Sequence, residues 1–374
     1  MQLKEIHVEG YRSLRSIKLV VDPLTVLVGE NGAGKSNLYR ALSLLQKAAE
    51  GTITEAIAEE GGLESVLWAG SRDRVTQRMV LTAVFNELTY RLEIGPPGVG
   101  EPALDHEPMI RAERLTLAYR DISVVLLERK GPKLWLRDDR GTSQRFEGEL
   151  LASEPALAAI RDAARYPELH LIRRALSSWR LYHAFDTGPG SPLRRPGPAL
   201  SRASLAADGH DLASVLATVV QMKQQPEPIR RAVAEAFKGS ELIIDATQGL
   251  CRLSMRTPEI ERPFGTAELS DGTLRYLCMV GALMALRPPP FMAFNEPEAS
   301  LHPELMAPLA NLMAAAAQTS QIWVVTHSEQ FATLLAHAGG MAPRRVAKID
   351  GATEIDVSSL REVPPAPLHP AMVA

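Results

Sequence analysis

The chain has 374 residues, of which 45% are hydrophobic and 23% are charged, as is ordinary for a globular protein. Its formal net charge of −3 gives no bulk attraction to nucleic acid, so any contact with DNA must come from a local basic patch. Residues 1–10 lack the apolar core of a signal peptide, and the longest apolar run, 276–286, is about half a membrane span. Cys251 and Cys278 lack metal-ligand spacing, which predicts reduced thiols rather than a disulfide. We expect a cytoplasmic protein with no membrane partner.

The N-terminal pattern predicts strands, a glycine-rich loop and a helix. Apolar residues alternate over 3–8 and 14–21, which indicates two strands. The run Leu24–Val28 is apolar and rich in β-branched side chains, as is typical of a strand buried on both faces. After a glycine-rich turn, leucines recur with a helical period over residues 37–49.

The middle of the chain, from about residue 52 to 265, has a different pattern. Apolar and polar residues alternate over 79–94 and 114–135, as in antiparallel strands. Apolar residues recur with a helical period over 154–180 and 211–238, which predicts helices. The Gly- and Pro-rich segment 187–198 predicts an exposed loop. There is no internal repeat and no sustained heptad pattern, so we expect no long coiled coil.

From residue 268 helices and strands alternate again. The pattern predicts a helix, a strand, a second helix and a second strand, over residues 273–286, 291–294, 303–317 and 322–325. A hairpin around Asp350 and Gly351 follows. We therefore expect the α/β class, with a mainly parallel core sheet, an antiparallel N-terminal sheet and a mixed α+β insertion.

The glycine-rich loop matches the phosphate-binding pattern G-x-x-x-x-G-K-[ST]. Its residues are Gly29, Glu30, Asn31, Gly32, Ala33, Gly34, Lys35 and Ser36, with Asn37 next in the chain. Glycines let backbone N–H groups surround the phosphates, Lys35 reaches the β- and γ-phosphates, and Ser36 ligates Mg²⁺. No guanine-recognition motif is present, so the pattern favours ATP over GTP, with Mg²⁺ as the second cofactor.

A second candidate site follows the strand at 291–294, which ends in Asn295 and Glu296. An apolar strand ending in an acidic pair is the Walker B arrangement. Its first position holds Mg²⁺ through water and its second activates the attacking water. The position of this pair, about 250 residues after a P-loop, strengthens an otherwise weak signal.

Two further motifs have the chemistry of nucleotide contacts. Ser270 and Gly272 open an apolar helix, where backbone N–H groups can form a second anion site. His327 follows a short apolar strand, and the carboxyl ends of such strands are where ligands bind in α/β sheets. A histidine there can hydrogen-bond the γ-phosphate or the attacking water.

Together, the segments GENGAGKSN, ELSDGT, FNEPEASLHP and VVTHS resemble the ABC-ATPase heads of the SMC, RecF and OLD type within the AAA-family ATPases. The resemblance covers about residues 1–50 and 265–330. It implies an N-terminal half of the head over 1–95, an insertion over 96–265 and a C-terminal half over 266–374.

The resemblance also implies a homodimer with ATP held between two heads. Lys35 and Ser36 of one copy would face Ser270 and Gly272 of the other. Glu296 would be the general base and His327 the switch histidine, and residues 299–302 would match the D-loop. A glutamine is also expected to line such a site, in a segment called the Q-loop; the motifs do not fix its position, and Gln77 is one candidate.

This sequence departs from the family pattern at two positions. Asp271 replaces the glycine that directly follows the serine in the LSGGQ signature, a variation that resembles the OLD-like branch. Asn295 replaces the Walker B aspartate, and an amide oxygen accepts a hydrogen bond but supplies no negative charge. We expect weakened Mg²⁺ binding and slow turnover. About 47 residues follow His327, too few for the TOPRIM domain of OLD-type nucleases.

Two functions remain open. The leading hypothesis is a stand-alone ATPase whose nucleotide-driven dimer acts on DNA or on an effector protein, in DNA maintenance or defence. The alternative is a non-catalytic ATP sensor or scaffold that regulates a partner nuclease or toxin. A P-loop kinase or GTPase leaves ELSDGT and VVTHS unexplained. The candidate DNA surface comprises Arg72, Arg74, Arg78, Arg194 and Arg195; the alternative is that these arginines only solvate exposed loops.

Overall fold

The computed structural model describes residues 1–70, 78–98, 104, 107–120, 122–223, 226–258 and 260–356. They form two compact units that alternate along the chain. Unit 1 contains residues 1–22, 30–179 and 346–355, and unit 2 contains residues 23–29 and 180–345, with Asp356. The insertion predicted over 96–265 is divided between the two units at Trp179.

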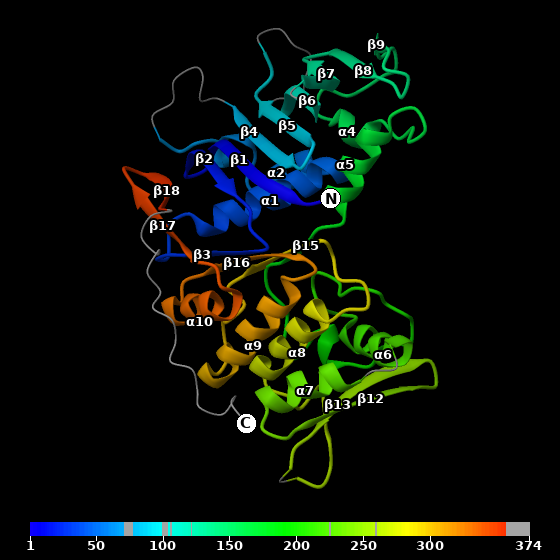
Figure 1. Ribbon diagram of the computed structural model, residues 1–374, viewed down its shortest axis with the longest axis vertical. Helices are drawn as coiled ribbons and strands as arrows, with labels where there is room; N and C mark the ends of the chain where they lie inside the picture. The colour runs from blue at the N-terminus through cyan, green and yellow to red at the C-terminus, as the bar shows by residue number, and fades with distance from the viewer. Residues whose placement is uncertain are drawn as a thin grey trace. The chain divides into compact units, whose positions relative to one another are not determined.

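Unit 1 is built on an eight-stranded antiparallel sheet (Figure 1). In sheet order, its strands are β2 (Leu14–Val20), β1 (Leu3–Tyr11), β4 (Met79–Phe85), β5 (Leu88–Gly95), β6 (Met109–Tyr119), β7 (Ile122–Lys130), β8 (Lys133–Arg137) and β9 (Ser143–Arg145). The helices of unit 1 are α1 (Lys35–Glu50), α2 (Ile53–Glu59), α3 (Leu63–Val66), α4 (Ala156–Ala159) and α5 (Pro167–Ser177). The antiparallel strands predicted from alternating residues are confirmed.

Helix α1 is the helix predicted after the glycine-rich loop. Its apolar face buries Leu38, Leu42 and Leu45 and packs against β1, β4 and α5. The helix ends at Gly51, whose φ of 85° is left-handed and whose N–H donates to the Lys47 carbonyl. The glycine-rich loop is therefore continuous with a helix anchored in the core of unit 1.

Unit 2 contains the parallel sheet expected for the α/β class. Its order is β10 (Arg180–Tyr182), β15 (Phe291–Asn295), β16 (Gln321–Thr326), β3 (Leu24–Val28) and β17 (Arg344–Ile349), and neighbouring strands run parallel. β17 leaves unit 2 after Arg345 and pairs with β18 (Ala352–Asp356). Every residue of β3 and β16 is buried, which explains their continuous apolar sequence.

Five helices and a small sheet complete unit 2. The helices are α6 (Leu212–Lys223), α7 (Glu227–Ala236), α8 (Asp271–Leu283), α9 (Pro303–Ala316) and α10 (Glu329–Gly339). The small sheet contains β11 (Gly197–Pro198), β12 (Glu241–Thr247), β13 (Leu250–Arg256) and β14 (Phe264–Gly265). α9 packs on β16, and α10 packs on both β16 and β3.

No helix in the described ranges is long and apolar enough to cross a bilayer. Both cysteines are buried and free, as predicted.

Three predictions for unit 2 and the end of unit 1 are wrong. The helix expected over 154–180 is two short helices, since Pro167 lacks an N–H and begins α5 as a new helix. Similarly, 211–238 contains two helices, and Pro226 precedes the second. The segment 187–198 is not a fully exposed loop: Thr187, Ser191 and Leu193 are buried.

A buried carboxylate holds the end of unit 1 together. Glu113 on β6 is fully buried and accepts the backbone N–H groups of Ala156 at 2.6 Å and Leu157 at 2.8 Å, and the Tyr90 hydroxyl at 3.0 Å. Directly opposite in the sheet, Arg129 donates to carbonyls that include that of Leu151 at 2.9 Å. These contacts tie the segment before α4 to the sheet.

We expect Glu113→Gln to lower the free energy of unfolding by about 2 kcal/mol, because the amide places an N–H₂ donor against backbone donors. Urea unfolding followed by circular dichroism measures this. Glu87→Gln, at an exposed turn position, is the matched control and should have no effect. Equal stability of the two variants would contradict this role of Glu113.

Candidate nucleotide-binding site

The three central strands of unit 2 end at one edge of the sheet, and a predicted site residue follows each of them. In the strand register Asn295 of β15 lies beside Val325 of β16, and Thr326 of β16 lies beside Val28 of β3. Because the strands are parallel, Glu296, His327 and Gly29 leave the sheet at the same edge. The carboxyl ends of parallel strands are the usual ligand-binding edge of an α/β sheet.

The P-loop continues from Gly29 into unit 1, where it begins α1. Gly34 is the N-cap of α1, and no side chain caps this end of the helix. The positive end of α1 is thus available to an anion. Lys35 is 4% exposed, and its ammonium donates to the Glu30 carbonyl at 2.7 Å. The lysine side chain therefore lies inside the P-loop.

A hydroxyl cluster supports the P-loop from within unit 1. The Thr353 hydroxyl donates to the Ala33 carbonyl at 2.9 Å and shares a 2.7 Å hydrogen bond with the Ser13 hydroxyl. Asn37 Nδ2 donates to Ser13 Oγ at 2.8 Å. Gly34, at φ 98°, lies so close that a Cβ there would be 1.9 Å from Thr353 Oγ1. This close approach, together with the left-handed φ, requires glycine.

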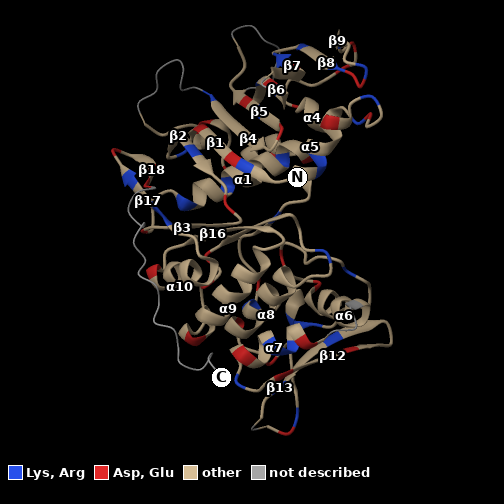
Figure 2. Ribbon diagram, viewed as in Figure 1, with Lys and Arg blue, Asp and Glu red and all other residues tan. Residues whose placement is uncertain are grey.

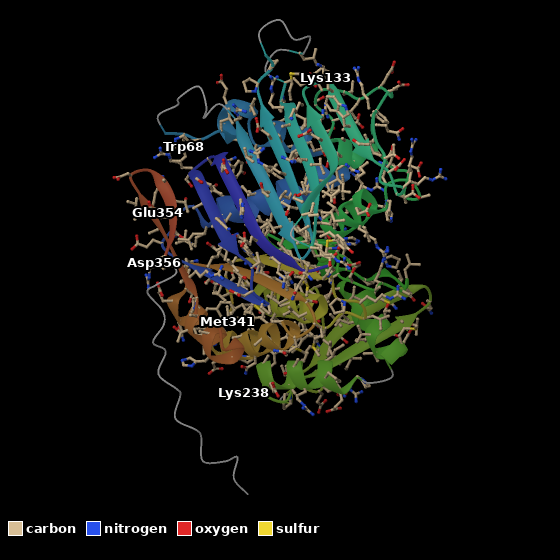
Figure 3. All side chains as sticks on the ribbon, turned by 45° about the horizontal axis from the view of Figure 1, so that its top comes forward. Trp68, Lys133, Lys238, Met341, Glu354 and Asp356 are labelled. Atoms are coloured by element: carbon tan, nitrogen blue, oxygen red, sulfur yellow. The ribbon has the colours of Figure 1, made fainter. Side chains whose placement is uncertain are left out.

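Sequence reasoning missed Ser13 and Thr353. Thr353 lies on β18, whose neighbouring residue Glu354 is labelled in Figure 3. It is separated from the P-loop by 320 residues of chain, so no local pattern could reveal it. Ser13 lies in the turn between β1 and β2, where none of the motifs assigned it a role.

Asn295, in the position of the Walker B aspartate, has a side-chain oxygen that accepts no hydrogen bond from the described residues. Its Oδ1 atom is buried and has no hydrogen-bond partner among the described residues. A buried amide oxygen without a donor is costly, and a water molecule on Mg²⁺ would supply the missing donor. The position therefore fits the predicted second-sphere role toward magnesium. The described residues contain no group of three or more His, Cys, Asp and Glu side chains that could hold a metal by themselves.

Glu296 has an unusual backbone conformation. Its φ is 49°, in the left-handed region, and its N–H donates to the Val325 carbonyl at 2.7 Å. For a non-glycine residue this conformation costs of order 1 kcal/mol and is frequent at functional sites. The side chain is 33% exposed, so water can reach its carboxylate.

His327 lies between two carboxylates. Its Nδ1 atom is 3.4 Å from Glu296 Oε1 and 3.9 Å from Glu298 Oε1. The structure thus brings together Glu296 and His327, which the sequence predicted as a pair, and adds Glu298.

Glu298 differs from Glu296 in its surroundings. It is 4% exposed, accepts a hydrogen bond from the Thr326 hydroxyl, and has a second oxygen that is buried without a partner among the described residues. Burial raises the pKa of the Glu298 carboxyl. Because water reaches Glu296 and not Glu298, Glu296 is the better candidate for a general base. The second carboxylate of the Glu-Pro-Glu sequence was the signal that could have identified Glu298.

The signature motif and the D-loop form one cluster in unit 2. Ser270 is the N-cap of α8, and its hydroxyl accepts the Thr273 N–H at 3.1 Å. A Cβ on Gly272 would lie 2.8 Å from the Ser300 carbonyl oxygen, so the glycine permits this contact. Arg275 donates to the Ala299 carbonyl and to the Ser300 hydroxyl, each at 3.1 Å. The two predicted segments are therefore held in register within one chain.

The predicted DNA surface is only partly described. Arg72, Arg74 and Gln77, the candidate Q-loop glutamine, lie outside the described residues. Arg78 pairs with Glu93, Arg195 is exposed, and the Arg194 side chain is 13% exposed and bound to the loop before α8. Figure 2 shows basic and acidic residues interspersed along the elements of both units. Arg194 therefore no longer belongs to a candidate DNA surface.

Comparisons with known proteins give the family to which this chain belongs. Residues 111–332, more than half of the chain, match the family model described as "AAA domain, putative AbiEii toxin, Type IV TA system". Residues 1–91 match a model described as "AAA ATPase domain".

Two curated relatives share parts of the sequence. The chain is 27% identical over 183 residues to the DNA replication and repair protein RecF of Renibacterium salmoninarum, covering 47% of this chain and 41% of that protein. It is 46% identical over 43 residues to the OLD nuclease of Thermus scotoductus, covering 12% of this chain and 8% of that protein. The chain therefore spans less than half the length of either relative.

Among solved structures, the Smc head domain with an extended coiled coil derived from Pyrococcus furiosus, bound to the C-terminal domain of ScpA, has a similar fold. The TM-score is 0.51 at 14% identity, with 95% of each chain covered. By the first family model the chain belongs to that AAA-domain family, and its similarity to parts of RecF and OLD nuclease supports the predicted resemblance to ABC-ATPase heads of the SMC, RecF and OLD type.

Proposed function

We propose that this chain binds ATP with Mg²⁺ at residues 29–37, pairs with a second copy across the nucleotide and hydrolyses ATP slowly. We further propose that this cycle acts on DNA or on an effector protein, in DNA maintenance or defence. The observation that carries the proposal is the common edge of the unit 2 sheet, from which Gly29, Glu296 and His327 all emerge. A P-loop by itself would support binding; the carboxylate and the imidazole, which emerge from the same sheet edge as Gly29, support hydrolysis.

In this mechanism the protein supplies position and charge. Backbone N–H groups of the P-loop, the Lys35 ammonium and the positive end of α1 hold the phosphates. Ser36 and Asn295 would hold Mg²⁺, which when bound neutralises charge on the phosphate oxygens. Glu296 accepts a proton from the water that attacks the γ-phosphorus, and the bond from that phosphorus to the β–γ bridging oxygen breaks.

The imidazole and the signature motif complete the proposed site. His327, 3.4 Å from Glu296, donates a hydrogen bond to the γ-phosphate or the attacking water. Ser270 and Gly272 of a second copy contact the same γ-phosphate with a hydroxyl and a backbone N–H. Hydrolysis in this arrangement depends on two copies, so the specific rate should rise with protein concentration until the dimer is saturated.

Asn295→Asp tests the proposed effect of the missing Walker B charge. We expect the variant to need about tenfold less Mg²⁺ for half-maximal activity and to turn over faster, because a carboxylate attracts the cation that an amide does not. Steady-state phosphate release across a Mg²⁺ titration measures both quantities. Asn311→Asp, at an exposed position on α9, is the matched control. Unchanged Mg²⁺ dependence and rate in Asn295→Asp would contradict the argument.

The second candidate function is a sensor or scaffold that binds ATP without turnover and regulates a partner nuclease or toxin. The amide at Asn295 is the observation that favours it. Equal, near-zero ATPase rates in the wild type and in Glu296→Gln would select this function over the enzyme.

The macromolecular target can be distinguished by its dependence on salt. ATP-dependent DNA affinity that falls steeply between about 50 and 200 mM salt would identify DNA, since phosphate contacts release counterions. Fluorescence anisotropy with a labelled duplex, with and without ATP, makes this measurement. Lack of any ATP-dependent affinity would exclude DNA and leave an effector protein as the target.

A further inference from the structure

The segment in front of β11 is anchored in unit 2 despite its Gly- and Pro-rich sequence. Thr187, Ser191 and Leu193 are buried, and the Ser191 hydroxyl donates to the Asp186 carbonyl at 2.5 Å. Arg194 ends the short 3-10 helix Pro192–Arg194, and its Nε donates to the Thr187 carbonyl at 2.8 Å. This anchoring fixes the direction in which the Arg194 guanidinium points.

The Arg194 guanidinium binds the residues that lead into the signature motif. Its Nη1 donates to the Leu269 carbonyl at 2.8 Å, and is 3.2 Å from the carbonyl oxygens of Thr266 and Ala267. Its Nη2 donates to Asp271 Oδ1 at 2.5 Å. A planar guanidinium has five N–H donors in a fixed fork, so it can hold several acceptors at once where a lysine could not.

The position of Asp271 explains why a cation is needed there. Asp271 is the first residue of α8 and lies in sequence between Ser270 and Gly272, the two predicted phosphate contacts. A carboxylate suits the positive end of a helix, and it also repels an incoming triphosphate. Its side chain is 59% exposed, and the Arg194 guanidinium pairs with it at 2.5 Å, which places a positive charge beside the carboxylate.

We propose that Arg194 is a positioning residue that acts on the nucleotide of a second copy. It holds the backbone of residues 266–269 and neutralises Asp271, so that Ser270 and Gly272 can approach a phosphate bound by the partner's P-loop. This inference rests on the proposed ATP-dependent dimer and adds a residue to it that no motif contains.

The experiment uses the full chain carrying Glu296→Gln, which should retain ATP. The dimer dissociation constant is measured by analytical ultracentrifugation in saturating ATP and Mg²⁺. We expect Arg194→Ala to weaken dimerisation at least about tenfold, while single chains bind a fluorescent ATP analogue as the parent does. Arg195→Ala, at the adjacent exposed residue, is the matched control and should change the constant less than about twofold.

Two further variants separate charge from backbone anchoring. Adding Asp271→Asn to Arg194→Ala should recover part of the lost affinity, because it removes the unpaired carboxylate. The dimer dissociation constant of Arg194→Lys should lie between those of the parent and Arg194→Ala, because an ammonium keeps the positive charge but lacks the planar set of N–H donors of a guanidinium.

Three results would overturn the inference while leaving the dimer intact. They are an unchanged dimer dissociation constant in Arg194→Ala, an equal loss of dimer affinity in Arg195→Ala, or a loss of ATP affinity by single chains of Arg194→Ala. The last of these would assign Arg194 to the folding of unit 2. A parent chain that does not dimerise with ATP would instead overturn the proposed function, and with it the inference.

Discussion

Replacing Glu296 with glutamine is expected to reduce steady-state ATP hydrolysis by about 10²- to 10⁴-fold, the usual contribution of a general base. Glutamine keeps the size of the side chain and its acceptor oxygen but cannot take a proton from water at neutral pH. ATP affinity should remain that of the wild type, because the residue acts on the attacking water. Phosphate release and equilibrium binding of a fluorescent ATP analogue measure the two quantities separately.

Glu329→Gln is the matched control for this prediction. Glu329 is an exposed carboxylate two residues after His327 and pairs with Arg345 at 3.0 Å, so its loss should leave the rate unchanged. A Glu296→Gln rate equal to a substantial wild-type rate would remove Glu296 from the role of base. Glu298 would then be the next carboxylate to test, because its Oε1 lies 3.9 Å from His327.

Lys35→Ala has the second large expected effect, on binding rather than on the chemical step. We expect ATP affinity to fall by about 100-fold, close to 2.7 kcal/mol, because the buried ammonium is a charge-assisted donor to the phosphates. In the structure the ammonium already lies inside the loop, where it donates to the Glu30 carbonyl. Isothermal titration with a non-hydrolysable ATP analogue measures the change.

Lys47→Ala controls for charge on the same helix. Lys47 lies in the last turn of α1 and pairs with Glu50 at 2.9 Å, far along the helix from the P-loop. Its removal should leave ATP affinity unchanged. Similar affinities in the wild type and in Lys35→Ala would show that the loop does not bind nucleotide as proposed.

The parts of this molecule that sequence predicts best are those where one short pattern fixes both structure and chemistry. The continuous apolar run of β3 followed by a glycine-rich turn predicts the strand, the turn and the start of α1, because a short run rich in β-branched residues is typical of a strand buried on both faces. The same argument holds for β15 and β16, whose ends carry Asn295 and His327. Helix α10, after β16, was not predicted.

The parts that sequence could not predict depend on contacts distant in the chain. Thr353 supports Ala33 across 320 residues, and Arg194 binds Asp271 across 77 residues. Composition also misled: prolines and glycines around residue 190 indicated an exposed loop, whereas buried Leu193 and the carbonyls bound by Arg194 anchor it. Side-chain bonds to backbone carbonyls leave no periodic signal, so no pattern search could recover them.

The structure gives different surroundings to Asp271 and Asn295, the two residues that depart from the family pattern. Asp271 would weaken an anion site if it were alone, and the structure pairs it with a guanidinium held by four carbonyl contacts. Asn295 has no such compensation among the described residues: its Oδ1 atom is buried without a donor. The first substitution is therefore compatible with a working signature motif, while the second is expected to slow the cycle.

The central claim is that ATP joins two copies of this chain through Lys35 of one and Ser270 of the other. Mass photometry of Glu296→Gln, with and without ATP and Mg²⁺, tests it most directly, because this variant should hold ATP without consuming it. We predict particles of twice the single-chain mass with ATP and of single-chain mass without it. Single-chain particles in both conditions, at protein concentrations where ATP is bound, would contradict the account.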